Sequence, residues 1–254
     1  MHRYGLLGSD LNVSIDGVAL KPAFALGGWL AFEPMGDTAM MMGDLVLTES
    51  EINPVMEKLL AKGVEVTALH NHLLRANPPT FYMHVSGQGD PADLARKVRA
   101  ALEESRTPFG VKPPAEAAAN SGFNFDTAKV EAAIGFKGRA NGGVYQFGIA
   151  RADSIKMQDM NVPPAMGTAI AINFQSTGEG KAAITGDFVA LESEVQPLIK
   201  ALRENGIEVT AIHNHMVGEE PRAFFVHFWA NDDAVKLASG LHAALKTVAV
   251  RGGS

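Results

Sequence analysis

Cysteine is absent from the 254 residues of this chain. The absence excludes disulfide frameworks, thiolate metal sites and cysteine nucleophiles, so any bound metal must be held by histidine, aspartate or glutamate. A long apolar run is missing as well. No stretch approaches the ~20 residues that a bilayer-spanning helix needs, and Met1 to Asp10 lacks the basic and apolar regions of a signal peptide. We therefore expect no transmembrane segment.

An excess of positive charge is the third absence. The formal net charge is −6 and the isoelectric point is near 5.7. Proteins that bind nucleic acid without specificity gain most of their affinity from lysine and arginine that neutralise phosphates. The composition therefore predicts no nucleic-acid partner. With 46% hydrophobic and 20% charged residues, it is typical of a globular protein that buries one large core or two small ones.

The chain contains an internal duplication. The stretch from Gly43 to Leu102 matches the stretch from Gly186 to Leu245 at a constant spacing of 143 residues and without a gap. Upstream, the segment that begins at Ala25 matches the one at Ala165 at a spacing of 140. This difference predicts that three residues were gained or lost in the hairpin between the two matching stretches.

The duplication predicts three parts: repeat 1 over residues 1–102, a linker over 103–124 and repeat 2 over 125–254. The linker is rich in proline, alanine and small polar residues and has no helical or strand periodicity. Each repeat is expected to run strand, strand, helix, strand, strand, helix. This order is typical of an α+β fold of ferredoxin-like type, with helices on one face of each sheet. We expect the two repeats to pack sheet to sheet around a cleft.

The helix ends carry local signals. The first helix of each repeat is expected to start near a serine cap, to hold a proline in its first turn and to stop before a glycine. These residues are Ser50, Pro54 and Gly63 in repeat 1 and Ser193, Pro197 and Gly206 in repeat 2. Asp90-Pro91 and Asn231 are the start signals expected for the second helix.

Six of the eight histidines occupy matching positions in the two repeats: His70, His72 and His84, and His213, His215 and His227. Residues two apart on a strand point to the same face. A hairpin turn centred on Asn77 would place His84 opposite His70 and Tyr82 opposite His72 on that face. A turn centred on Glu220 would pair His227 with His213 and Phe225 with His215. The spacing therefore predicts one histidine triad on a β-hairpin of each repeat.

Three neutral imidazoles form a common transition-metal site and leave one coordination position open for water or substrate. Zinc is the first choice of metal, and copper or iron are the alternatives. Zinc-activated water would make the protein a metal-dependent hydrolase that acts on an unidentified small molecule. Two other interpretations stay open. The protein can capture a metal or small ligand without catalysis, or the histidines can be buried core residues that hydrogen-bond to one another.

Other candidate residues are weaker. Tyr82 is a candidate proton donor beside the first triad, although packing is the more frequent role of a strand tyrosine. Glu219 and Glu220 are candidates for a general base or a fourth ligand, and a solvated turn is the alternative. Asp44 and Asp187 are expected in turns ahead of a strand. The run Met40–Met42 is expected in the core rather than in a soft-metal site.

The segments VTALHNHLL and VTAIHNHMV, together with GGVYQFGIARAD, PPAMGTAIAINFQ and ITGDF, resemble the LppY/LpqO family of bacterial proteins over nearly the whole chain. This family is a domain of unknown function that is often found in exported proteins or lipoproteins. The resemblance implies an exported or periplasmic protein, while this chain starts without the family's leading helix and export signal. It implies no reaction.

Overall fold

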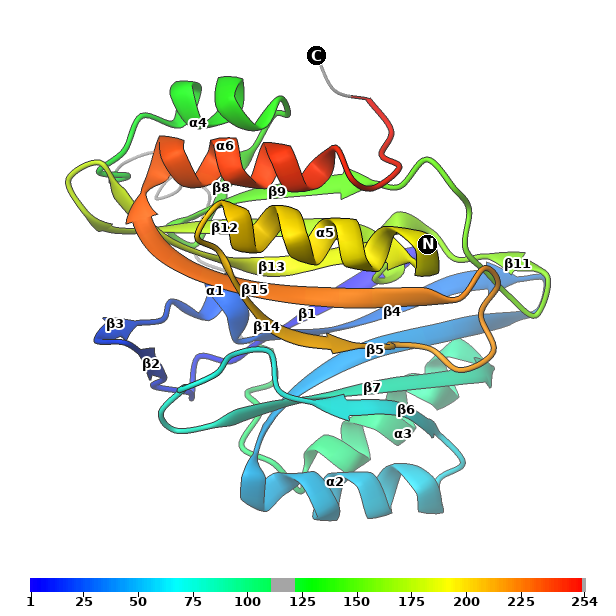
Figure 1. Ribbon diagram of the computed structural model, residues 1–254. Helices are drawn as coiled ribbons and strands as arrows, with labels where there is room; N and C mark the ends of the chain where they lie inside the picture. The colour runs from blue at the N-terminus through cyan, green and yellow to red at the C-terminus, as the bar shows by residue number, and fades with distance from the viewer. Residues whose placement is uncertain (111–121, 253–254) are drawn as a thin grey trace.

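The computed structural model describes residues 1–110 and 122–252, so the middle of the expected linker lies outside the described residues. The described residues form a mixed α/β structure with six α-helices and two large antiparallel sheets. The sheets lie against each other in the middle of the molecule, and helices cover their outer faces (Figure 1). The order strand, strand, helix, strand, strand, helix is present in both halves.

The first sheet has five strands in the order β1-β4-β5-β7-β6. Two helices, α2 and α3, pack on its outer face (Figure 1). The bounds of these elements are β1 His2–Leu7, β4 Gly27–Met35, β5 Thr38–Thr48, α2 Glu49–Ala61, β6 Glu65–His70, β7 Thr80–Gly89 and α3 Pro91–Leu102.

The second sheet has six strands in the order β14-β15-β13-β12-β9-β8. Its outer face is covered by α5 and α6, and α4 packs beside α6 (Figure 1). The bounds are α4 Thr127–Ile134, β8 Arg139–Asn141, β9 Val144–Ala150, β12 Ala169–Gly178, β13 Lys181–Leu191, α5 Glu192–Glu204, β14 Glu208–His213, β15 Ala223–Asp233 and α6 Ala234–Leu245.

Short elements lie between β1 and β4 of the first sheet and between β9 and β12 of the second. They are the hairpin of β2 (Ser14–Ile15) and β3 (Val18–Ala19), the single turn α1 (Pro22–Ala25), the hairpin of β10 (Lys156–Met157) and β11 (Met160–Asn161), and the 3-10 turn η2 (Pro164–Met166).

The first helix of each repeat begins earlier than expected. Thr48, not Ser50, is the N-cap of α2, because the Glu51 carboxylate accepts the backbone N–H of Thr48 at 2.8 Å. Glu194 accepts the backbone N–H of Leu191 in the same way at 2.7 Å. The prolines Pro54 and Pro197 consequently lie inside the helices rather than in the first turn. The helix ends agree with the expectation, since Gly63 and Gly206 both adopt a left-handed φ of 72°.

The second helices also differ in one detail. The expected cap Asp90 accepts the backbone N–H of Asp93 at 2.7 Å and starts α3. In repeat 2 the prediction that the helix starts at Asn231 is wrong, because β15 continues through Asp233. That aspartate caps α6 by accepting the backbone N–H of Lys236 at 2.8 Å.

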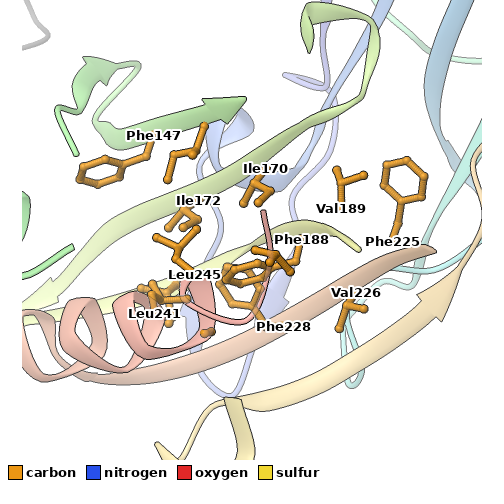
Figure 2. Packing of buried hydrophobic residues seen from close by; sticks show 14 of the residues in the cluster. Phe147, Ile170, Ile172, Phe188, Val189, Phe225, Val226, Phe228, Leu241 and Leu245 are labelled. Atoms are coloured by element: carbon orange, nitrogen blue, oxygen red, sulfur yellow. The ribbon is translucent and has the colours of Figure 1, made fainter. Parts of the chain in front are cut away.

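Alternation along the strands divides the apolar residues between the helices and the opposite sheet. In β15, Val226 and Phe228 face the helices, whereas Phe225 and His227 face the first sheet. Figure 2 shows the helix side, where residues of α6 lie over residues of β12, β13 and β15. Labelled examples are Leu241, Leu245, Ile172, Phe188 and Phe228. In β5, Met41 faces the helices, and Met40 and Met42 pack between the sheets. The core interpretation of these methionines is confirmed.

The strand pairing corrects the expected difference in length between the equivalent hairpins of the two repeats. Trp29 lies opposite Asp44, and Ala171 lies opposite Asp187. The equivalent strands β4 and β12 are therefore 142 residues apart. The hairpin accounts for one inserted residue rather than three, and the irregularity in β12 between Ser176 and Gly178 accommodates it.

A buried arginine ties the end of β9 to the start of α5. Its guanidinium forms two hydrogen bonds with the Glu194 carboxylate, at 2.7 and 3.1 Å, and an ion pair with Asp153 at 2.7 Å. It also donates to the backbone carbonyl of Val189 at 2.6 Å. This residue is Arg151, and its side chain is 2% exposed. Bidentate, charge-assisted hydrogen bonds of this kind are stronger than single neutral ones, and here the arginine that forms them is buried.

We expect Arg151→Ala to lower the free energy of unfolding by about 2–3 kcal/mol, because the half-buried Glu194 would lose its charge-assisted hydrogen bonds. Urea unfolding at neutral pH would measure the change. The matched control is Lys200→Ala, which removes an exposed partner of Glu204 and should cost less than about 0.5 kcal/mol. Equal losses of unfolding free energy in both variants would show that the Arg151 ion pair contributes no more than an exposed one.

Candidate metal centre

The hairpin register differs from the expected one by two residues in both repeats. His84 lies opposite Ala68 and Tyr82 lies opposite His70, and a bulge interrupts β6 between Val66 and Ala68. In repeat 2, His227 lies opposite Ala211 and Phe225 opposite His213, with the same bulge in β14. The predicted pairs His70–His84 and His213–His227 are therefore wrong. A shift of two residues keeps every side chain on its face, so the expected histidine face is still present.

The six histidines form one cluster between the sheets, which we call the histidine cluster: His70, His72, His84, His213, His215 and His227. Rings from the two repeats stack on one another. The centroid distances are 3.5 Å for His70 and His213, 3.8 Å for His72 and His227, and 3.8 Å for His84 and His215. The structure thus joins the two expected triads in one place. The rings themselves fill the cleft that was expected there.

Among the described residues, four groups of potential ligand atoms lie within 4.8 Å of one another, and the two all-histidine groups combine both repeats, whereas each of the other two lies within one repeat. One group contains His70, His72, His213 and His227, and another contains His70, His84 and His215. Two further groups add a carboxylate: Asp44 with His72 and His84, and Asp187 with His215 and His227. These two groups consist of equivalent residues, because each residue of the first group lies 143 positions before one of the second. The two carboxylate groups therefore keep the symmetry of the duplication.

Every histidine of the cluster has a buried Nε2 atom without a hydrogen-bond partner among the described residues. Two of the rings are oriented through their other nitrogen. His227 Nδ1 lies 3.0 Å from the Gly186 carbonyl oxygen, and His213 Nδ1 lies 3.2 Å from that of Asn214. A donor at Nδ1 leaves the lone pair of Nε2 free, which is the arrangement of metal-binding histidines in general.

Asp44 and Asp187 are site residues that the sequence interpretation missed. They do not precede a strand but lie inside β5 and β13, opposite His84 and His227. Asp44 Oδ1 lies 3.8 Å from His84 Nε2 and has no hydrogen-bond partner among the described residues. Extending the expected strand back to Met40 would have revealed this, because alternation places Asp44 on the face shared by Met40 and Met42.

Burial controls the protonation of the cluster. It lowers the pKa of His70 to about 3 and that of His213 to about 4, and it holds the pKa of the other four histidines well below the usual value. Burial also raises the pKa of Asp44 to about 8 and that of Asp187 to about 7. At neutral pH all six imidazoles are neutral, the form that binds a metal ion.

Two aromatic rings close the ends of the cluster. Tyr82 stacks on His72 at a centroid distance of 3.4 Å, and Phe225 stacks on His215 at the same distance. The Tyr82 hydroxyl donates to the Ala25 carbonyl oxygen at 2.7 Å, and burial raises its pKa. These contacts favour packing over proton donation for Tyr82, because its proton is engaged away from the cluster.

The two glutamates at the second hairpin tip lie apart from the ligand groups. Glu219 is buried and accepts the backbone N–H of Ala223 at 3.1 Å. Glu220 is exposed, and its backbone pairs with that of Lys156. Neither contributes an atom to the four groups of potential ligands among the described residues. Their expected role as general base or fourth ligand has no support in this geometry.

A family model described as "Domain of Unknown Function (DUF1259)" and labelled DUF1529 matches residues 1–104 and 128–247. The chain belongs to this family. Its description names no activity, and its match covers both repeats and thus every residue of the histidine cluster. No curated protein sequence matches the chain.

Solved structures match this family member only distantly. The trimeric bacterial microcompartment shell protein PduB is 11% identical, with 87% of this chain and 86% of that chain covered and a TM-score of 0.23. The regulatory subunit of aspartate kinase from Thermus thermophilus is 13% identical, with 86% and 95% covered and a TM-score of 0.22. Such low scores carry no argument about function. In the described parts of the chain, no helix has the length and apolar character to cross a membrane.

We expect the metal-free protein to be most stable near pH 6.5–7. Below this range the unfolded state binds more protons, because the folded histidines have lowered pKa values, so stability falls with acidification. Above it stability also falls, because folding holds protons on Asp44 and Asp187 that the unfolded chain releases. Melting temperatures in the presence of a chelator would show this maximum. Asp44→Asn should flatten the fall between about pH 7 and 8 and steepen the acidic side down to about pH 4, because Asp44 is protonated only in the folded state over this whole range. An unchanged profile would contradict the assignment.

Proposed function

We propose that this protein binds a transition metal at the histidine cluster, with ligands from both repeats around each ion. The observation that carries the proposal is the set of six buried Nε2 atoms that face one another without a partner among the described residues. Leaving a buried polar atom unsatisfied costs about 1–3 kcal/mol. A metal ion that accepts several of these lone pairs would remove that cost.

The geometry weighs against the interpretation of the histidines as mutually satisfied core residues. That interpretation requires ring-to-ring hydrogen bonds, and none joins two of the six rings in the described structure. Instead the rings stack nearly parallel, for example at an interplanar angle of 7° between His70 and His215. Stacked neutral imidazoles bring their nitrogens together without using them.

Zinc is the metal that we propose first, with copper or iron as the alternatives. Neutral imidazole suits all three metals, and the carboxylates of Asp44 and Asp187 are further ligands that zinc accepts. The two all-histidine groups share His70. Occupation of one group would therefore affect the other, and the duplication offers at most two all-histidine positions among the described residues.

A metal-dependent hydrolase is the enzymatic form of this proposal. A bound zinc ion would supply water activation at neutral pH. The group of His70, His84 and His215 supports this, since three histidines leave a fourth position for water. His70 and His213 are half-buried, so their rings are the part of this group and its neighbour that lies nearest to solvent, although their Nε2 atoms are buried. Asp44 lies next to His84 and carries a proton at neutral pH, because burial raises its pKa to about 8, so it is placed to donate a proton.

Metal binding without catalysis is the second candidate function. Burial favours it: His84, His215 and His227 are only 4%, 5% and 2% exposed. A substrate larger than water would have to displace packed rings to reach these three residues. Turnover therefore separates the two candidates.

We also propose the finer description of the fold as two tandem repeats of ferredoxin-like type packed sheet to sheet. The order β4-β5-β7-β6, with α2 and α3 on one face, supports it. In a ferredoxin-like repeat the last strand follows the second helix, whereas here the equivalent strand, β4, comes before β5, β6 and β7.

We also propose that the protein is exported or periplasmic, and the resemblance to the LppY/LpqO family supports this proposal.

The ligand sets can be tested by elemental analysis of protein purified without a histidine tag. His72 and His227 belong to one all-histidine group. His72→Ala, His227→Ala and the double variant should therefore each lower the metal content by about one ion per chain. His72→Ala combined with His215→Ala should lower it further, because His215 belongs to the other group. The control His2→Ala changes an exposed histidine of β1 and should leave metal content unchanged. A metal content that is unchanged in both His72→Ala and His227→Ala would refute the ligand assignment.

Metal should also stabilise the fold. At about pH 7.5, zinc at a hundredfold excess over its dissociation constant should add about 2.7 kcal/mol, or about 5–10 °C in melting temperature, relative to chelator. At about pH 5.5 the difference should shrink, because protons compete for the imidazoles. Coincident melting curves with zinc and with chelator at the higher pH would contradict metal binding.

A further inference from the structure

The two repeats differ at the clamp around Arg151. In repeat 2 this guanidinium has three acceptors: the Glu194 carboxylate, the Asp153 carboxylate and the Val189 carbonyl oxygen. All three recur 143 residues earlier, as Glu51, Asp10 and Val46. The arginine itself does not recur, because its position in repeat 1 is Gly8.

Glu51 is held in the same orientation as Glu194. Its carboxylate accepts the backbone N–H groups of Thr48 and Arg106, both at 2.8 Å. Glu194 accepts those of Leu191 and Ala249, at 2.7 and 2.9 Å. The carboxylate that binds a guanidinium in repeat 2 is thus fixed by equivalent backbone contacts in repeat 1. With Glu51 only 8% exposed, this negative charge is buried.

The missing guanidinium cannot be supplied from position 8. A Cβ atom on Gly8 would lie 2.1 Å from the Leu26 carbonyl oxygen, so this backbone excludes every side chain. Arg106 is nearby but forms no ion pair with Asp10 or Glu51 in the described structure, where its backbone alone contacts Glu51. Among the described residues, no cationic side chain is therefore bound to the two carboxylates.

An open pocket leads to these acceptors. It has a volume of about 720 Å³, and its lining includes Asp10, Glu51 and Arg106. A small void beside it, of about 10 Å³, is lined by Gly8, Asp10 and Val46 and has room for about one water molecule. The larger volume is within the range of small-molecule sites. A ligand can therefore reach Asp10 and Glu51 from solvent.

We propose that this pocket in repeat 1 binds a small molecule that carries a guanidinium group. Its planar fork would bridge Glu51 and Asp10 as Arg151 bridges Glu194 and Asp153 in repeat 2. A carboxylate presents two oxygens in the geometry that a guanidinium matches with two parallel N–H groups, whereas an ammonium acts as a point charge. The site is separate from the histidine cluster and does not depend on a bound metal.

The test uses methylguanidinium chloride as the probe at constant ionic strength, followed by heteronuclear NMR. The amides of Thr48 and Arg106 donate to Glu51 and should shift saturably, whereas the equivalent amides of Leu191 and Ala249 should not move. Asp10→Asn and Glu51→Gln should each weaken binding at least about tenfold. Glu104→Gln, which changes an exposed carboxylate paired with Lys58 in the same pocket, should alter it less than about twofold.

Two further variants make the test decisive. Arg151→Gly empties the clamp of repeat 2, so methylguanidinium should then also shift the amides of Leu191 and Ala249. If that variant does not fold, Asp10→Asn still tests the site, since Asp10 is exposed. Binding that appears only in Arg106→Gln would show that Arg106 fills the site and would overturn the proposal. Equal binding of tetramethylammonium, tighter binding of calcium or an absence of saturable shifts would overturn it as well.

Discussion

The contact between the inner faces of the two sheets is the constraint on which the rest of the structure depends. Each sheet has one face covered by its own helices and must bury the other, and the duplicated repeat supplies the cover. The imidazoles on the inner faces of the sheets therefore stack on those of the other repeat, at centroid distances of 3.5–3.8 Å. Burial keeps these rings neutral, and their packing leaves the Nε2 atoms for a ligand rather than for one another.

Duplication explains both the symmetry of the molecule and its departures from symmetry. Tyr82 and Phe225 occupy equivalent places on equivalent histidines, yet only the tyrosine hydroxyl ties its strand to Ala25. Arg151 fills a carboxylate clamp in one repeat, and Gly8 leaves the corresponding clamp accessible in the other. Shared packing positions thus keep the fold, while single substitutions give equivalent positions of the two repeats different contacts.

The sequence predicted much of the fold and the face of the site because both follow local periodicity. The order of strands and helices, the caps at Asp90 and Gly63, and the shared face of the histidines were all readable. The register was not, since the pairs next to the hairpin tip, such as His70 with Tyr82, are already displaced by two residues from the expected pairing, and the bulge between Val66 and Ala68 shifts the pairs beyond it by one more. Asp44 was missed for a related reason, because β5 runs past the glycine that suggested a turn.

The sequence by itself determined the repeat, the residue types and the strand face that could form a metal site, because spacing along a strand fixes which side chains share a face. Only the tertiary structure decided that the two triads meet in a single cluster, that Asp44 and Asp187 join it, and that Glu219 and Glu220 do not. These facts depend on how one sheet is placed on the other. That placement is set by the sum of many apolar contacts and by bulges in the edge strands, and neither is encoded in any one segment.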